Sequence, residues 1–301
     1  MSYCLNPACH KPQNPKDANF CQSCGSKLLL TPDSTSAKNS RYRALKLLGE
    51  GGFGRTFLAV DEENPQKKEC VIKQFFPQGS TYSAVMPLAG NSVSGGEQIE
   101  ESKGRAIAQR CGCNIPRKAA ELFEAEAMQL EMLGTHPQIP KFLGHFQQDG
   151  HQYLIQEHIE GKNLAEELAE KGAFNETQIW ELLNDLLPVL QFVHKSKVIH
   201  RDLKPENIIR RRLSPGKIDL ENHGETEVKT ANKNQLFLVD FGAAKVVQKS
   251  GLPKTGTVIG SAAYTAPEQL MGKAVFASDI YSLGVTCIHL LTQVPPFDLF
   301  D

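Results

Sequence analysis

Four polar side chains of different charge stand in two short motifs of this chain. The octapeptide HRDLKPEN at residues 200–207 holds Asp202, Lys204 and Asn207, and the tripeptide DFG at 240–242 begins with Asp240. Transfer of a phosphoryl group needs a group that orients the attacking hydroxyl, a cation that offsets phosphate charge, and oxygen ligands for Mg²⁺. The two motifs contain a candidate for each task.

Three further motifs stand in a fixed order relative to the octapeptide and DFG. GEGGFG at 49–54 and VIK at 71–73 precede the octapeptide, and APE at 266–268 follows DFG. DFG alone carries almost no weight, but all five in this order have a probability of coincidence well under roughly 1%. Over residues 41–301 the chain resembles the eukaryotic-type (Hanks-type) serine/threonine protein kinases of bacteria, in particular a cyanobacterial type with an N-terminal four-cysteine motif.

The resemblance implies a role for each polar side chain of the catalytic motifs. Asp202 is expected to accept the proton of the substrate hydroxyl and orient it, and Lys204 to stabilise charge on the transferred group. Asn207 and Asp240 are expected to hold magnesium. In the family, a lysine at the position of Lys204 accompanies serine or threonine acceptors, and Ser261 fits the same preference.

A glycine turn, a lysine and a hinge are expected to bind ATP. Glycines let backbone N–H groups approach phosphates closely, and Lys73 is expected to neutralise the α and β phosphates. Its acidic partner is predicted to be Glu126, with Glu124 as the alternative, and Gln156 is expected at the gatekeeper position. The implied nucleotide-binding residues are Gly49, Gly51, Phe53, Gly54, Lys73, Glu126, Glu157 and Ile159.

A regulatory phosphate is expected in the segment between DFG and APE. Thr255 and Thr257 lie there, and a phosphate on either could pair with Arg201 through charge-assisted hydrogen bonds. The alternative is that both are ordinary loop threonines.

Composition excludes several other classes of protein. The chain has 301 residues, 40% hydrophobic and 22% charged, which suffices for two folded units and excludes a disordered protein. A formal net charge of −1 gives no excess of positive charge of the kind that binds nucleic acid. No apolar run approaches the ~18 residues that span a bilayer, so we expect a cytoplasmic protein without a membrane segment.

Four of the eight cysteines form two pairs near the N-terminus: Cys4, Cys9, Cys21 and Cys24. Four thiolates meet the tetrahedral requirement of a structural Zn²⁺, and a segment this small has no other means of folding. The pattern resembles a zinc ribbon, with His10 as an alternative to Cys9, while redox-active thiols are the competing interpretation. A regulatory protein partner is a better expectation for this module than nucleic acid.

The elements that must position these residues follow an α+β pattern. A capping box of Asn175 and Gln178, followed by apolar residues at helical spacing, predicts a helix with Pro188 inside it. The apolar residues are expected to lie in the core: Ile179, Leu182, Leu183, Leu186, Leu187, Leu190 and Val193. A second helix is predicted from Asp279 to Leu291. Strands are predicted at residues 42–48, 55–60, 70–75, 141–146 and 151–156.

The predicted architecture is a bilobal protein-kinase-like fold, with a β-rich small lobe and a mainly helical large lobe, preceded by a small zinc ribbon. The large lobe is expected to be incomplete, without the arginine that pairs with Glu268 in the family. Cys111 and Cys113 are expected to be incidental loop cysteines. The expected divisions are the ribbon at 1–30, a linker at 31–40, the small lobe at 41–160 with an insertion near 78–116, and the large lobe at 161–301 with an insertion near 212–234.

The resemblance therefore implies a kinase that transfers the γ-phosphate of ATP to serine or threonine hydroxyls of proteins, including its own activation segment. ATP, Mg²⁺ and a structural Zn²⁺ are the expected cofactors. The alternative is a non-catalytic kinase-like module that binds nucleotide or a partner, because an incomplete large lobe would lack the substrate platform.

Overall fold

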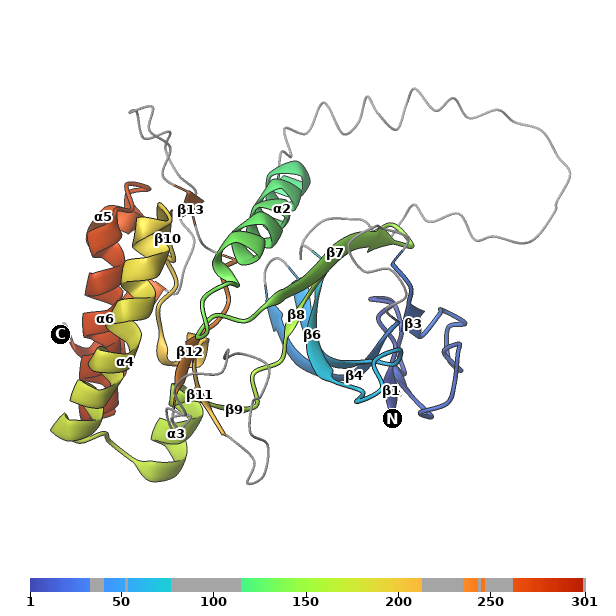
Figure 1. Cartoon of the computed structure of the whole chain (residues 1–301), viewed down its shortest axis with the longest axis horizontal. Coiled ribbons are helices and arrows are strands. Elements are labelled where there is room, and N and C mark those ends of the chain that lie inside the picture. The colour runs from blue at the N-terminus through green and yellow to red at the C-terminus, as the bar shows by residue number, and fades with distance from the viewer. Residues whose placement is uncertain are drawn as a thin grey trace, which may run out of the picture. The chain divides into compact units, whose positions relative to one another are not determined.

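The computed structural model describes residues 1–32, 41–51, 54–76, 115–212, 235–242, 245–246 and 262–299 (Figure 1). They belong to two units. Unit 1 comprises Met1–Glu124 and Leu143–Ile155, and unit 2 comprises Ala125–Phe142 and Gln156–Asp301. Among the described helices, none combines the length and apolar character needed to cross a bilayer.

A six-stranded sheet, with neighbouring strands in the order β3-β4-β5-β6-β8-β7, dominates unit 1. All five predicted strands are confirmed, with small differences at their ends. Asp149 and Gly150 have φ of +50° and +76°, as expected for the two-residue turn of the β7–β8 hairpin. The strands of unit 1 are β1 (Ser2–Tyr3), β2 (Gln13–Asn14), β3 (Leu29–Leu30), β4 (Tyr42–Gly51), β5 (Gly54–Asp61), β6 (Glu69–Phe75), β7 (Phe142–Gln148) and β8 (His151–Glu157).

The core of unit 1 joins this sheet to the cysteine module, defined here as residues 1–32. The end of the module, β3, pairs with β4 and so becomes a strand of the same sheet. Leu5 and Leu30 are buried in one apolar cluster with Phe57 and Ile72. Most of the expected linker, residues 33–40, lies outside the described residues.

Unit 2 consists of helices with short strands, which together with unit 1 confirms the α+β prediction. Its three-stranded sheet has the order β12-β11-β9, and β10 pairs with β13. The elements are β9 (Gly161–Asn163), α3 (Leu164–Lys171), α4 (Glu176–Lys195), β10 (Val198–Ile199), η3 (Pro205–Asn207), β11 (Ile208–Arg211), β12 (Leu236–Leu238), β13 (Lys245–Val246), η4 (Ala262–Tyr264), α5 (Pro267–Leu270), α6 (Phe276–Thr292) and η5 (Pro296–Leu299).

Helix α4 begins at the predicted capping box, in which Asn175 and Gln178 each bond the other's backbone N–H. The helix continues through Pro188 to Lys195. Its apolar stripe is buried at Leu182, Leu186 and neighbouring positions, but Leu187, which was expected in the core, is 42% exposed. The stripe is therefore wider than the surface that the described residues cover.

Helix α2 spans Ile115–Leu133 and is shared between the two units. It begins at the end of the segment 78–116 that was expected to be an irregular insertion. Pro116 is compatible with this start, because the first turn of a helix does not use its N–H groups. The rest of that segment, including Cys111 and Cys113, lies outside the described residues, as does the insertion expected near 212–234 apart from Arg212.

Candidate functional site

Two predicted magnesium ligands lie beside a strand pair in unit 2. β11 pairs with β12, with Ile208 opposite Leu238, and the Val239 N–H donates to the Asn207 carbonyl at 3.0 Å. Asn207 directly precedes β11 and Asp240 follows β12 by two residues. The antiparallel pairing thus brings both to the same end of the pair.

Asp202 lies at the centre of a polar cluster. Its Oδ2 is 2.9 Å from the Lys204 Nζ and accepts a hydrogen bond of 2.9 Å from the Asn207 Nδ2. Nδ2 also donates to the Asp202 carbonyl at 2.8 Å, so the amide oxygen is the atom that Asn207 can offer to a metal ion. The Asp202 side chain keeps 13% exposure and is therefore accessible to a substrate.

Asp279, at the start of α6, holds the backbone next to Asp202. Its two carboxylate oxygens accept the N–H groups of His200 and Arg201, each at 2.9 Å. Its Oδ2 is also 2.7 Å from the Nε2 of His194 on α4. Sequence reasoning placed Asp279 on a helix but gave it no role in the site, because its partners are 78 and 79 residues away.

His200 is fully buried and its two ring nitrogens have different partners. Nδ1 accepts the Asp202 N–H at 3.3 Å, which leaves Nε2 to carry the proton and donate to the Val239 carbonyl at 3.2 Å. Burial lowers the pKa of His200, and the nearby Asp279 carboxylate only partly offsets this. The neutral imidazole thus joins the two catalytic motifs.

Two residues of the site have left-handed backbone conformations without being glycine. Arg201 has φ +68° and Asp240 has φ +66°. Such conformations cost free energy and persist where the surroundings hold them, often at functional sites. At Arg201 the backbone N–H donates to the Asp279 carboxylate, and the backbone carbonyl accepts a hydrogen bond of 2.7 Å from the Gln269 Nε2.

The two candidate acids on α2 have different surroundings. Glu126 is 5% exposed, and its Oε2 lies 3.1 Å from the position that a Cβ would take on Gly242, where Asp240 Oδ1 is also close at 3.3 Å. Glu124 is exposed and accepts a hydrogen bond from Gln152. The burial beside DFG favours Glu126, the residue predicted from the sequence.

The glycine turn connects β4 and β5 in unit 1, where Gly51 pairs with Gly54. A Cβ on Gly54 would lie 2.2 Å from the Gln74 carbonyl oxygen on β6, so this position requires glycine. Lys73 on β6 lies opposite Thr56 on β5 in the strand register. The structure thus brings the turn and the lysine onto adjacent strands, while Phe53 lies outside the described residues.

The predicted hinge begins with the last two residues of β8. Glu157 donates its N–H to the Lys141 carbonyl at 2.9 Å, so the backbone group that it can offer to adenine is its carbonyl. Gln156 and Ile159 are buried. Within the described residues the Gln156 Oε1 has no hydrogen-bond partner, and such a buried acceptor at the predicted gatekeeper is open to a ligand's donor.

The four N-terminal thiols form one cluster. The Sγ atoms of Cys4, Cys9, Cys21 and Cys24 lie within 4.8 Å of one another, with Cys4 to Cys24 and Cys9 to Cys21 both at 3.6 Å. A tetrahedral Zn²⁺ with Zn–S bonds of about 2.3 Å would separate its sulfurs by about 3.8 Å. The donor set therefore fits zinc, and it contains Cys9 rather than His10.

Backbone geometry at the second cysteine pair favours a thiolate. Burial alone would raise the pKa of Cys21, but the N–H groups of Cys24 and Ser23 and the Asn14 side chain bond to its sulfur, and the net effect lowers the pKa to about 6. Gly25 has φ +73°, which lets the chain turn back so that the Cys21 N–H donates to the Ser26 carbonyl at 2.8 Å. Burial instead raises the pKa of Cys4.

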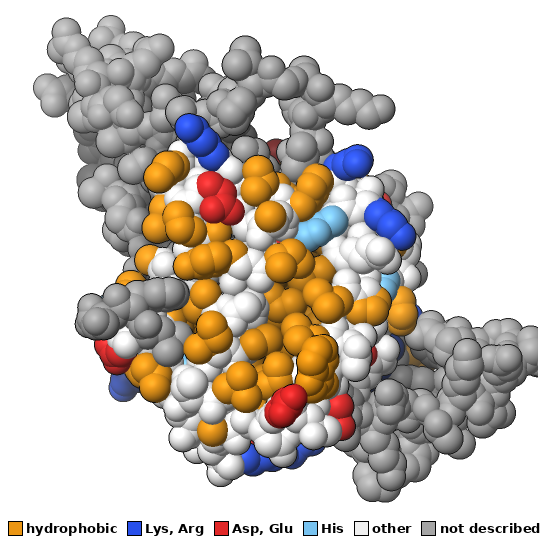
Figure 2. All heavy atoms as spheres, turned by 90° about the vertical axis from the view of Figure 1, so that its left-hand side faces the viewer, with side chains coloured by type: hydrophobic (Ala, Val, Ile, Leu, Met, Phe, Trp, Pro, Cys, Tyr) orange, Lys and Arg blue, Asp and Glu red, His pale blue; other side chains and the backbone are white. Residues whose placement is uncertain are grey.

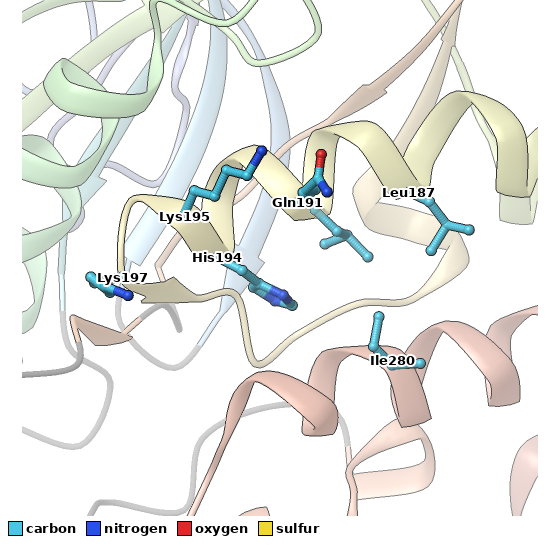
Figure 3. A pocket seen from close by; sticks show the side chains of 7 residues that line it. Leu187, Gln191, His194, Lys195, Lys197 and Ile280 are labelled. Atoms are coloured by element: carbon cyan, nitrogen blue, oxygen red, sulfur yellow. The ribbon is translucent and has the colours of Figure 1, made fainter.

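An apolar face covers part of unit 2. Figure 2 shows apolar side chains gathered on the side of the molecule where α4 and α6 lie. A pocket of about 430 Å³ lies between these helices, and in Figure 3 His194 and Leu187 of α4 and Ile280 of α6 border it. Exposed large apolar residues on the two helices are Trp180, Leu187, Ile280, Tyr281, Ile288 and Leu291.

The remaining predicted residues lie partly outside the described chain. Thr255, Thr257 and Ser261 are not among the described residues, so their relation to the buried Arg201 is not tested. Glu268 is described: it is half-buried and accepts a hydrogen bond from the Ser278 hydroxyl. The serine hydrogen bond does not test whether Glu268 lacks the arginine that pairs with it in the family, so that expectation stays a prediction.

Comparison with known proteins shows the family to which the chain belongs. The model of the protein kinase domain matches residues 99–300, and the chain belongs to this family. It is 37% identical over 99% of its length to serine/threonine-protein kinase B of Synechocystis sp., covering 43% of that protein. It is 34% identical over 87% of its length to serine/threonine-protein kinase PknA of Nostoc sp., covering 38% of that protein. It is 37% identical over 86% of its length to serine/threonine-protein kinase C of Synechocystis sp., covering 40% of that protein. The chain thus spans less than half of these relatives.

Proposed function

We propose that this chain is an ATP-dependent protein kinase that phosphorylates serine and threonine hydroxyls, including those of its own activation segment. The observation that carries the proposal is the Asp202 cluster, in which one carboxylate is paired with Lys204 and fixed by Asn207. The named relatives are serine/threonine-protein kinases.

The residues of unit 2 supply the acid–base and electrostatic parts of the reaction. Asp202 accepts a hydrogen bond from the substrate hydroxyl and takes its proton as the oxygen attacks. Lys204, bonded to the same carboxylate, offsets negative charge on the transferred group. Asp279 acts through the backbone of residues 200 and 201, since its carboxylate fixes the loop that carries Asp202.

Metal and nucleotide are assigned to residues whose donors suit them. An amide oxygen from Asn207 and the Asp240 carboxylate are ligands that Mg²⁺ prefers, and the bound ion would offset the charge of the ATP phosphates. The glycine turn donates backbone N–H groups to the phosphates, and Lys73 pairs with them. The Glu157 carbonyl and the Ile159 N–H are the proposed contacts of adenine.

Zinc, a regulatory phosphate and a partner complete the proposal. The four sulfurs of the cysteine module hold one structural Zn²⁺, and the module presents a surface to a regulatory protein. A phosphate on Thr255 or Thr257 pairs with Arg201. The free, buried thiols of Cys70 and Cys287 fit the reducing conditions of the cytoplasm, which is the proposed location.

Phosphosite mass spectrometry after incubation with Mg-ATP tests the activity. The parent chain is compared with Asp202→Asn, which removes the proton acceptor but keeps the shape of the side chain. We expect phosphate on serine or threonine in the parent, and a loss of at least about 100-fold in the variant.

Binding of Mg-ATP, measured by calorimetry on both proteins, separates the two candidate functions. Binding without phosphorylation in the parent would favour the non-catalytic nucleotide-binding module. Equal phosphorylation of parent and Asp202→Asn would show that a contaminating kinase is responsible and would contradict the assignment of Asp202.

A further inference from the structure

Two polar side chains in the core of unit 1 are bonded to a backbone carbonyl of the cysteine module. Arg55 on β5 and Gln74 on β6 both donate to the Leu5 carbonyl, Arg55 through Nη2 and Gln74 through Nε2 at 3.0 Å. Arg55 Nη2 also lies 2.6 Å from Gln74 Oε1. Gln74 Nε2 donates in addition to the Tyr153 hydroxyl at 3.2 Å.

This network has little access to water. Gln74 has no exposed surface, Tyr153 is 3% exposed and Arg55 is 8% exposed. A buried polar group that loses its partner costs more free energy than an exposed one, because water cannot replace the partner. Displacement of the Leu5 carbonyl would leave donors of both side chains unsatisfied, so the positions of Leu5, Arg55 and Gln74 are coupled.

The network adjoins the proposed nucleotide-binding residues. Arg55 directly follows Gly54 and Gln74 directly follows Lys73, and Arg55 pairs with Gln74 across the two strands. The Gln74 carbonyl lies against Gly54 so closely that a Cβ there would be 2.2 Å away. A shift of Gln74 therefore moves the strand that carries Lys73 and the end of the glycine turn.

We propose that Arg55 and Gln74 are positioning residues for the nucleotide, and that the Leu5 carbonyl of the cysteine module holds them in place. The inference rests on the proposed function, in which the glycine turn and Lys73 bind the phosphates of ATP. Neither side chain touches the nucleotide; both set the spacing of β5 and β6 beneath it. The module is thereby part of the ATP-binding apparatus.

The test uses Gln74→Met in the full chain, because methionine keeps the length of glutamine and removes both hydrogen-bonding groups. We expect the Kd and KM for Mg-ATP to rise about tenfold, the effect of losing one to two hydrogen bonds. We expect kcat at saturating ATP to stay within about threefold of the parent. Tyr153→Phe, which removes a single bond at the edge of the network, is expected to raise both constants about twofold to threefold.

Arg43→Gln is the matched control. Arg43 also joins the cysteine module to the sheet, since its Nη1 donates to the Ala18 carbonyl at 2.6 Å and its Nε is paired with Glu62. It lies on β4 opposite Val60, toward the other end of the β4–β5 pair from the glycine turn. Its loss should lower the melting temperature without changing the affinity for Mg-ATP.

The affinities of the three variants for Mg-ATP decide whether the proposal holds. Weaker binding in Gln74→Met and Tyr153→Phe, with parental affinity in Arg43→Gln, supports the proposal. Parental affinity in both network variants overturns it, and so does equal weakening in Arg43→Gln at a similar loss of melting temperature. If Gln74→Met does not fold, Tyr153→Phe and Arg43→Gln decide. A parent that fails to bind Mg-ATP overturns the proposed function and this inference together.

Discussion

At the scale of single residues, His200 makes the site sensitive to acid. Its pKa is lowered by burial, so in the unfolded state it binds a proton at a higher pH than in the folded state. Its contribution to stability is complete above the unfolded pKa of about 6.5 and is lost as pH falls toward the folded value. A proton on Nδ1 would also remove the acceptor of the Asp202 N–H.

We therefore expect the free energy of unfolding, measured in urea at pH 8, 7, 6 and 5, to fall less steeply below about pH 6.5 in His200→Gln than in the parent. His10→Gln is the control, since this histidine is exposed. Loss of zinc at low pH would affect all three proteins alike, so the difference between them isolates His200. Identical slopes in the parent and His200→Gln would contradict the lowered pKa of His200.

Whether a residue of the site could be predicted from the sequence depends on how far along the chain its partners lie. The proximity of Asp202, Lys204 and Asn207 could be predicted because they share one octapeptide, while their roles in catalysis stay a prediction. Asp279 could not be assigned a role, since its contacts with residues 200 and 201 form only when α6 packs beside that loop. The same holds for Gln74, whose partner Leu5 is 69 residues away.

At the scale of elements, the pairing of β5 with β6 depends on one glycine. In Gly54→Ala the new Cβ would lie 2.2 Å from the Gln74 carbonyl, so the strands must separate. We expect the free energy of unfolding to fall by about 1–3 kcal/mol, together with weaker binding of Mg-ATP. Urea unfolding followed by circular dichroism measures the first effect, and calorimetry the second.

Gly49→Ala is the matched control within the same glycine motif. A Cβ there would meet no atom within 4 Å, so the free energy of unfolding should change by no more than about 0.5 kcal/mol. Equal destabilisation by both substitutions would mean that glycine flexibility, rather than the contact with Gln74, determines the stability of the hairpin.

Strands and helices were predictable where local patterns agree with burial. The alternating strands and the Asn175 cap are local signals, and the structure follows them. Leu187 was placed in the core because helical periodicity shows which residues are apolar, not which surface is covered. Its exposure, with that of Ile280 on α6, depends on packing across the whole unit.

At the scale of the molecule, the cysteine module and the sheet of unit 1 share one core. Sequence composition suggested an independent ribbon before a linker, because the polar stretch at 31–40 separates the cysteines from the first strand. Composition could not show that β3 pairs with β4 or that Leu5 enters the apolar cluster. These contacts join residues before the polar stretch to residues after it. The module should therefore not unfold alone.

Removal of zinc should consequently destabilise the whole of unit 1. We expect a chelator to lower its melting temperature by roughly 10 °C or more, and hydrogen exchange to rise in β4 and β5 as well as in residues 1–32. Cys21→Ser should lose zinc and behave like the chelated protein, while Cys287→Ser, a buried thiol outside the cluster, should keep its metal. Less than roughly half an equivalent of zinc in the parent, with Cys21→Ser unchanged, would contradict the metal. Faster exchange confined to residues 1–32 would contradict the shared core, because β3 would then leave β4 without disturbing the strands that carry the glycine turn.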